Sequence, residues 1–324
     1  MAAALRLKIA IATYGHTAAL KDGRAPIEGA DPEFVEISPV IQAFRRMVRD
    51  LEFDVCEMAP ATYMIARAAG APFKALPVFI MRRFHHGGIV CREDSGIGKP
   101  KDLEGKKVGV RAYSVSTGIW TRGILADEYG LDNSEVTWVV DDEEHVAALK
   151  LPPNVMRAPP GRSLVAMMAA GELQAAFTGP AGIGRSGAPT AGWEAAAPAR
   201  NYRELLEDAP RLEEEWFRRT KIYPVHGLIM VKDRLLAEHP WLAGSLFGAF
   251  AKAKSFYLER LAAGDIQTDA DRSYVELSKL VGDPLPYGLK ANLRAIEALI
   301  RYSFRQGLLP EQYPPAEMFV DPQA

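Results

Sequence analysis

Histidine side chains are the residues of this chain best suited to proton transfer near neutral pH, because an unperturbed imidazole titrates at about 6.5. The chain has six histidines. His145 and His239 lie in polar or helix-start contexts and are expected at the surface. The other four lie in segments expected to face a ligand cleft, and they are His16, His85, His86 and His226. This pattern predicts general acid–base chemistry.

A polar turn between a strand and a helix predicts an anion-binding site. The stretch KKVGVRAYSVSTGIWTRGILADEYG, residues 106–130, opens with a buried strand and passes through the turn into a helix. The first backbone N–H groups of a helix have no partner inside it, so they bind anions readily. Ser116 and Thr117 can donate hydroxyls there, and Arg122 adds positive charge. An ordinary βα unit with a capped helix explains the same stretch without a ligand.

Further side chains in these segments could bind a ligand or polarise a catalytic group. Arg83, Arg111 and Arg122 are candidates for a carboxylate clamp, and a solvated surface position is the alternative for each. Trp120 could stack on an aromatic ring, or simply fill the core. Glu57 ends a strand and could polarise a histidine or accept a phenol proton. An N-cap of the following helix is its alternative role.

Motifs for metals and nucleotides are weak. His16, His85, His86 and Glu57 could in principle meet at a divalent ion, but no HxH or HxxxH spacing supports such a site. Neighbouring histidines on a strand also point to opposite faces. The loop GPAGIGRSG at residues 179–187 lacks the GK[ST] of a P-loop. We therefore expect neither a metal nor an organic cofactor.

Short apolar strands alternate with amphipathic helices along the chain. The expected strands span residues 5–12, 53–58, 73–80, 87–91, 108–110, 136–140, 173–177 and 222–231. The expected helices span residues 39–51, 60–69, 163–170 and 202–219, with one after the Ser/Thr turn and a mostly helical stretch from 240 onward. A Gly-, Pro- and Ala-rich loop is expected at 178–200. This alternation predicts an α/β protein with parallel sheets and helices on both faces.

Two crossings divide the chain into a discontinuous domain and an inserted one. The first is the turn-rich connector after Asp94, and the second is the strand-like run that begins at Ile222. The first domain is expected to comprise residues 1–95 and 224–324, and the second residues 96–223. In such α/β pairs the ligand cleft lies between the domains, outside the carboxyl ends of the strands.

Composition excludes several classes of partner. The chain has 324 residues, of which 48% are hydrophobic and 25% charged, with a formal net charge of −2. This balance gives no electrostatic case for nucleic acid or an anionic membrane. No apolar run approaches the ~18 to 20 residues of a membrane span, and the charged N-terminal run does not resemble a secretion signal, so we expect a cytoplasmic protein. Cys56 and Cys91 lie in apolar runs and are expected to be buried thiols.

Four runs carry a resemblance to a known family: PVFIMRRFHHGGI, GIGKPKDLEGKKVGVRAY, STGIWTRGILADEYG and KIYPVHGLIMV…HPWLAGSLFGAFAKAK. They resemble the 4,5-dihydroxyphthalate decarboxylase family over about residues 5–305. The resemblance implies the fold of type II periplasmic binding proteins with two α/β domains and a cleft site. It also implies cofactor-free decarboxylation of a hydroxylated aromatic acid in the cytoplasm.

The resemblance also implies roles for individual residues. His86 and His226 match histidines of the family, so one of them is expected to donate the proton, with Glu57 as a third catalytic candidate. His16 and His85 stand where the family usually carries arginine. These replacements weaken the case for a dicarboxylate as substrate, because arginine suits a bidentate grip on a carboxylate. The expected substrate-binding residues are His16, Arg83, His85, Tyr113, Ser116, Thr117, Trp120 and Arg122.

The sequence therefore predicts a cofactor-free decarboxylase that acts on a hydroxylated aromatic carboxylic acid resembling 4,5-dihydroxyphthalate. Its partners are expected to be this small-molecule acid and further copies of the chain in a homo-oligomer. A non-catalytic solute-binding protein for a small anion is the alternative from a different class. An isomerase or hydrolase for a related acid is a third reading, because fold alone does not choose between functions.

Overall fold

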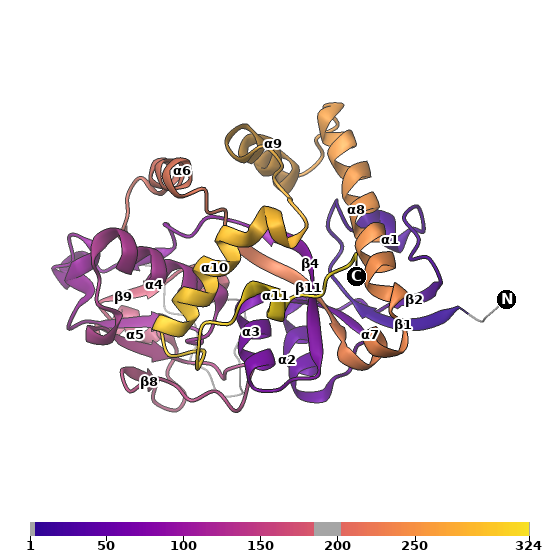
Figure 1. Ribbon diagram of the computed structural model, residues 1–324. Coiled ribbons are helices and arrows are strands. Elements are labelled where there is room, and N and C mark those ends of the chain that lie inside the picture. The colour runs from indigo at the N-terminus through magenta and orange to yellow at the C-terminus, as the bar shows by residue number, and fades with distance from the viewer. Residues whose placement is uncertain (1–3, 185–201, 324) are drawn as a thin grey trace. The chain divides into compact units, whose positions relative to one another are not determined.

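The computed structural model describes residues 4–184 and 202–323, and the chain forms two compact units (Figure 1). The first unit comprises Met1–Arg83, Val225–Glu297 and Tyr313–Ala324, and the second comprises Phe84–Pro224 and Ala298–Gln312. The first crossing thus comes after Arg83, whereas the sequence places it at residue 95. The reason is that β5 (Ile89–Cys91) pairs with strands of the second unit. The end of the expected loop 178–200, from residue 185, lies outside the described residues.

A five-stranded sheet forms the centre of the first unit. Its order is β2-β1-β3-β11-β4. The strands span Ala30–Phe34 (β2), Leu5–Ala10 (β1), Val55–Met58 (β3), Val225–Lys232 (β11) and Phe73–Arg82 (β4). β3 and most of β4 are buried on both faces, as their largely apolar sequences predict. Because β1 and β3 are parallel, the loops that follow them leave the sheet at the same end, where both strands have their carboxyl ends.

The direction of β11 corrects the expectation of purely parallel sheets. β11 runs antiparallel to both β3 and β4. Its register with β4 is interrupted: Val225 faces Arg82 and Gly227 faces Met81, so His226 is an extra residue in a β-bulge. Bulges re-aim side chains and are common beside active sites. The sheet is therefore mixed, and its return strand carries a local irregularity at one of the candidate histidines.

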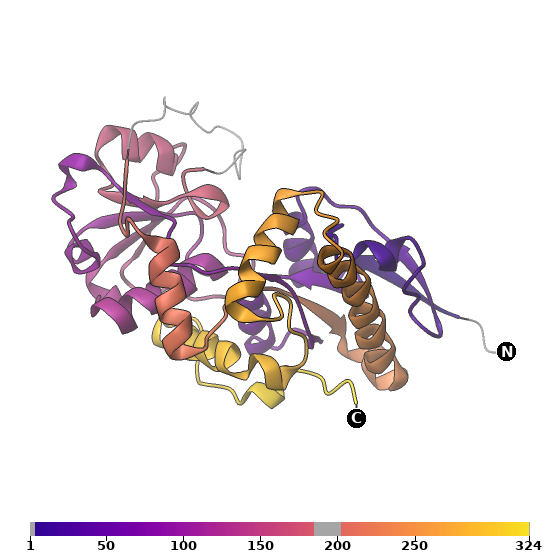
Figure 2. The same ribbon diagram turned by 90° about the horizontal axis from the view of Figure 1, so that it is seen from above.

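Helices cover the sheet of the first unit. They span Ala18–Lys21 (α1), Ile41–Asp50 (α2), Pro60–Ala68 (α3), Asp233–Glu238 (α7), Trp241–Ala262 (α8), Asp269–Val281 (α9), Leu289–Arg305 (α10, whose last residues belong to the second unit) and Pro315–Met318 (α11). The longest, α8, appears in orange beside α1 and the N-terminal strands (Figures 1 and 2). Leu242, Leu246 and Phe250 of α8 join a buried core with Leu7 and Ile9 of β1. This core holds β1 in place and so supports the loop that follows the strand.

A six-stranded sheet forms the second unit, in the order β10-β5-β9-β6-β7-β8. Besides β5, the strands span Arg203–Glu204 (β10), Ala175–Phe177 (β9), Lys107–Val110 (β6), Thr137–Val140 (β7) and Val155–Arg157 (β8). β9, β6, β7 and β8 are parallel to one another, but β5 is antiparallel to both of its neighbours, β9 and β10. β8 and β10 were not expected from the sequence.

Three α-helices and four 3₁₀ turns complete the described part of the second unit. They span Ser116–Tyr129 (α4), Leu164–Ala170 (α5), Ala209–Thr220 (α6), Glu93–Ser95 (η1), Pro100–Leu103 (η2), Asn133–Glu135 (η3) and Gly179–Ala181 (η4). α4 begins at the predicted Ser/Thr turn and ends at Gly130, which adopts the left-handed conformation that terminates helices. In neither unit does the described chain contain a helix long and apolar enough to cross a membrane.

Candidate active site

His16 lies in a cluster of aromatic rings after β1. Its imidazole stacks on Tyr14, with ring centroids 5.3 Å apart and planes within 4°, and meets Tyr257 and Tyr274 edge-on. The residue is 1% exposed, and neither ring nitrogen has a hydrogen-bond partner among the described residues. Burial lowers the His16 pKa to about 4, although the backbone carbonyl of Ile80 acts in the opposite direction. His16 is therefore a neutral imidazole at neutral pH.

Glu57 holds the loop that carries His16. Its carboxylate accepts hydrogen bonds from the Tyr14 hydroxyl at 2.7 Å and from the Ala12 amide at 3.0 Å. Burial raises the pKa of Glu57, and these two bonds oppose the rise. The alternative role as a helix cap does not apply, because Ala59 is the N-cap of α3. The contacts of Glu57 thus connect β3 to the loop after β1.

Gly15 is required by the packing of this loop. A Cβ atom at Gly15 would lie 2.2 Å from Cε2 of Tyr257, whose hydroxyl is fixed by a 2.7 Å hydrogen bond to Asp271. Gly15→Ala is therefore expected to lower the free energy of unfolding by about 1–3 kcal/mol through overpacking. Urea denaturation measures the change, with Gly248→Ala in α8 as the control. A Cβ there meets nothing within 4 Å, so that variant should be neutral or slightly more stable. Equal stability of both variants would contradict the packing argument.

Arg83 and His226 form a pair at the β11 bulge. Nη2 of Arg83 lies 2.9 Å from Nε2 of His226. A guanidinium only donates, so Nε2 accepts and the neutral ring carries its proton on Nδ1. Burial and the charge of Arg83 both lower the pKa of His226. The arrangement presents a positive charge next to a neutral imidazole, which suits recognition of an anion better than storage of a proton.

His85 and His86 do not lie on a regular strand, because β4 ends at Arg82 and β5 begins at Ile89. The His85 ring is parallel to Trp120 of α4 within 3°, at a centroid distance of 6.3 Å. The His85 carbonyl accepts a hydrogen bond of 3.0 Å from the Thr121 hydroxyl. These contacts attach the segment after β4 to the first half of α4.

His86 packs against α6. Its ring meets Trp216 at 5.2 Å in an edge-on arrangement, and its backbone N–H donates to Oε1 of Glu213 at 3.1 Å. The same carboxylate oxygen lies 4.0 Å from Nδ1 of His86. Burial lowers the His86 pKa to about 4. An approaching carboxylate would raise it again, because an opposite charge favours the protonated ring.

The start of α4 is held from one side by Glu144. Its carboxylate accepts the backbone N–H groups of Tyr113 at 2.6 Å and Ser114 at 3.2 Å, and also the Ser114 hydroxyl. Val115 is the N-cap, so Ser116 and Thr117 occupy the first helical turn. N–H groups in a first turn point out of the helix and have no intrahelical acceptor. Glu144 therefore fixes the turn that precedes the helix.

Arg122 supports this turn from inside the unit. It is fully buried, and it donates from Nε to Gln306 at 2.7 Å and from Nη2 to the Tyr113 carbonyl at 2.6 Å. Its guanidinium also lies 4.0 Å from the centroid of the Tyr113 ring. A Cβ at Gly118 would come within 2.9 Å of Nη1, so the glycine makes room for the guanidinium. These contacts favour a positioning role for both Tyr113 and Arg122.

Arg111 is likewise committed to the interior of the second unit. It pairs with Asp142 at 3.1 Å, and both side chains are largely buried. Arg83, in contrast, is exposed. Of the three arginines considered as a carboxylate clamp, Arg83 is thus the one whose contacts best suit a ligand. Over residues 4–184 and 202–323, no three His, Cys, Asp or Glu side chains gather in a group that could hold a metal ion.

The predicted site residues fall into small groups. The first unit brings together His16 with Glu57 through Tyr14, and Arg83 with His226. The second unit places His85 on Trp120 and leaves Ser116 and Thr117 at the start of α4. The sequence missed the partners that fix them, namely Tyr14, Asp142, Glu144, Glu213, Trp216, Tyr257, Tyr274 and Gln306. Only Tyr14 carried a local signal, as a neighbour of His16.

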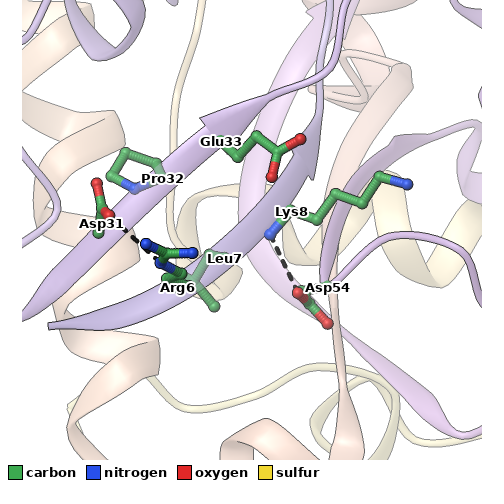
Figure 3. A pocket seen from close by; sticks show the side chains of 7 residues that line it. All are labelled: Arg6, Leu7, Lys8, Asp31, Pro32, Glu33 and Asp54. Carbon is green, nitrogen blue, oxygen red and sulfur yellow. Dashed lines mark hydrogen bonds and ion pairs between the residues drawn. The ribbon is translucent and has the colours of Figure 1, made fainter. Parts of the chain in front are cut away.

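A surface hollow of about 330 Å³ lies elsewhere in the first unit. It is lined by Arg6, Leu7, Lys8, Asp31, Pro32, Glu33 and Asp54 (Figure 3). Arg6 pairs with Asp31 there, and both are largely exposed. The hollow lies along the first half of β1, whereas the loop with His16 follows the other end of that strand. We assign it no part in acid binding.

Comparisons with known proteins identify one relative that matches over nearly the full length and a second that matches over about half of this chain. The chain is 33% identical to 4,5-dihydroxyphthalate decarboxylase of Comamonas testosteroni over 97% of this chain and 96% of that protein. It is 38% identical to a protein of the same name from Pseudomonas putida, over 53% of this chain and 69% of the relative. Residues 32–151 also match the family described as ABC transporter, phosphonate, periplasmic substrate-binding protein.

Solved structures support the architecture. The alkanesulfonate-binding protein SsuA from Xanthomonas axonopodis pv. citri, bound to MOPS, matches with a TM-score of 0.53 at 18% identity, covering 98% of each chain. The desulfurization enzyme DSZB matches with a TM-score of 0.54 at 14% identity, over 98% of this chain and 96% of that one. At these identities the likeness concerns the fold alone. It confirms the predicted α/β, periplasmic-binding-protein-like fold.

Proposed function

Since the chain belongs to the 4,5-dihydroxyphthalate decarboxylase family and is a carboxy-lyase, we propose that it removes CO2 from a hydroxylated, phthalate-like aromatic acid. The observation that carries this proposal is the identity of 33% to a 4,5-dihydroxyphthalate decarboxylase over almost the whole of both chains. The side chains described above add the means to bind an anion and to deliver a proton. His16 and His85 stand where the family usually carries arginine. We therefore include both monocarboxylates and dicarboxylates among the acids to be tested.

We assign proton delivery to His86. The reaction exchanges the carboxylate on a ring carbon for a proton: the imidazolium gives its proton to that carbon, the bond to the carboxylate breaks, and CO2 leaves. Histidine suits this task because its pKa can be moved across the working pH by its surroundings. Burial lowers the His86 pKa to about 4, and a bound substrate anion raises it again. The ring is then protonated and can donate this proton to the ring carbon of the substrate.

Two positively polarised elements, one within each unit, are each assigned as a candidate for binding the acid. One is the first turn of α4, where Ser116 and Thr117 add hydroxyl donors to the helix N-terminus. The other is the Arg83–His226 pair, in which a guanidinium stands beside an Nδ1–H tautomer. Charge-assisted hydrogen bonds from such groups are stronger than neutral ones. Glu57 is assigned the positioning of the loop with Tyr14 and His16.

Arg83→Gln tests the second of these elements. We expect the KM for the acid to rise about tenfold or more, because a hydrogen bond to a charged group contributes about 1.5–3 kcal/mol. kcat should change less, since the proton donor remains. Steady-state kinetics of CO2 release measures both, with Arg6→Gln, whose side chain is 93% exposed, as the control. An unchanged KM would remove Arg83 from the binding site.

The proposal is tested by incubating the protein with a panel of hydroxybenzoates and hydroxyphthalates and measuring CO2 release. The same panel with a chelator present tests for a metal requirement. Sulfonate analogues of the best acid serve as controls, because they keep the negative charge but have no carboxylate to lose. We expect turnover of at least one acid and competitive inhibition by its sulfonate analogue. Absence of CO2 from every acid that binds would refute the proposal.

A solute-binding function is the second candidate. The match of residues 32–151 to a periplasmic substrate-binding family favours it. Such a protein needs donors and shape but no group that transfers a proton. Calorimetry with the same panel separates the candidates, because a solute-binding protein would retain its acid unchanged.

A further inference from the structure

We propose that Glu213 is a positioning residue for His86, fixing which ring nitrogen delivers the proton. This inference rests on the proposed function of His86. Sequence analysis gave Glu213 no role, since it lies within a charged run of α6. The carboxylate would receive the Nδ1–H of the imidazolium, and Nε2–H would then be the proton given to the ring carbon.

The first support is the geometry of one oxygen atom. Oε1 of Glu213 accepts the backbone N–H of His86 at 3.1 Å and lies 4.0 Å from its Nδ1. The backbone bond therefore fixes the carboxylate against the residue whose ring it faces. Nδ1 of His86 has no hydrogen-bond partner among the described residues, and the histidine side chain is 1% exposed. A buried nitrogen of this kind needs an acceptor once it is protonated.

The second support is the packing around the ring. Trp216 lies three residues after Glu213 on α6, so both side chains leave the same face of the helix. Trp216 meets the His86 ring at 5.2 Å with planes at 70°, and the Phe84 ring also contacts Trp216 and Phe217. These ring contacts restrict rotation of His86. The carboxylate and the tryptophan together define both the position and the plane of the imidazole.

Burial dominates the pKa shifts of both members of the pair, so the support for this role is the geometry. Glu213 is partly buried, and burial raises its pKa, while bonds from the backbone of His86 and Gly87 oppose the rise. An opposite charge at about 4 Å favours the protonated imidazole. After the proton has left Nε2, the neutral ring keeps its proton on Nδ1, facing Glu213, and Nε2 is ready to be protonated again from solvent.

Glu213→Gln tests the inference, because the amide oxygen still accepts the His86 backbone N–H while the charge is lost. NMR titration of the His86 ring nitrogens needs no substrate, so it reports on Glu213 independently of the proposed function. We expect the His86 pKa to fall by about one unit or more, since an opposite charge shifts a pKa by about 1–3 units. The Nδ1–H tautomer should also become less populated. Glu215→Gln, an exposed position on the same helix that pairs with Arg211, is the control.

Kinetics give the second readout. Above the pKa, a shift of one unit lowers the imidazolium population about tenfold, so kcat of Glu213→Gln should fall about tenfold and its decline should begin at lower pH. A thermal unfolding curve close to that of the parent shows that the variant is folded, and Glu213→Asp should restore part of the His86 pKa. An unchanged His86 pKa and tautomer in Glu213→Gln would overturn the inference whatever the rate. A lowered pKa together with normal turnover in a His86 variant would uphold the coupling and refute the proposed donor instead.

Discussion

Replacing His86 by asparagine is expected to lower kcat by about 10²- to 10⁴-fold, the usual contribution of a positioned general acid. Asparagine keeps the backbone N–H that Glu213 accepts and preserves a polar side chain of similar size. The KM should change far less, because the binding of the acid is assigned to Arg83 and the start of α4. Single-turnover CO2 release measures the chemical step directly. His239→Asn, on the partly exposed histidine at the end of α7, is the control.

The same assignment predicts the direction in which activity changes with pH. With the imidazolium as the proposed donor, we expect activity to be lost as the pH rises and the ring loses its proton. In the free protein burial lowers the His86 pKa to about 4, so kcat/KM should decline from there upward. The decline of kcat should begin at higher pH, because the bound anion raises the pKa in the complex. A kcat that rises with pH, or a His86→Asn variant of normal rate, would exclude His86 as the donor.

Arg122→Met is expected to destabilise the second unit. The change leaves the carbonyl of Tyr113 and the amide oxygen of Gln306 buried without their donor, at a cost of about 1–3 kcal/mol each. We therefore expect the free energy of unfolding in urea to fall by about 2–6 kcal/mol. Arg301→Met is the control, because Arg301 forms a partly exposed ion pair with Asp127 and should contribute less than about 1 kcal/mol.

The same variant separates two roles for Arg122. If the guanidinium supports the turn before α4, stability falls first, and the KM rises only as the turn loosens. If it grips the substrate, the KM rises at full stability. Kinetics at a temperature where Arg122→Met remains folded distinguishes these outcomes. Unchanged stability together with a raised KM would indicate that Arg122 binds the carboxylate of the substrate.

Burial explains which elements could be predicted from the sequence. Val108–Val110 and Phe73–Ile80 were expected as strands because nearly every residue is apolar, and both are buried in the sheets. β8 was missed because Val155–Arg157 is a short edge strand with two exposed residues in a proline-rich stretch. The antiparallel direction of β11 has no local signal either. It follows from pairing with β3 and β4, which lie far away in the sequence.

The candidate site was predictable in its residue types but not in its partners. The resemblance and the polar turn pointed to His86 and the start of α4. Glu213 lies 127 residues from His86, and Gln306 lies 184 residues from Arg122, so no short-range spacing could reveal either bond. The role of Arg122 was the least predictable, because an arginine that is wholly buried looks the same in sequence as one at the surface.

The bulge in β11 places His226 outside the regular pairing of the sheet. His226 is the residue that has no counterpart on β4, since Val225 and Gly227 face consecutive residues there. The register shifts a second time between Gly227 and Ile229, and the regular ladder with β4 then runs from Ile229 to Lys232. We therefore expect a substitution of His226 to disturb the pairing of β11 with β4 less than a substitution within the regular ladder from Ile229 to Lys232.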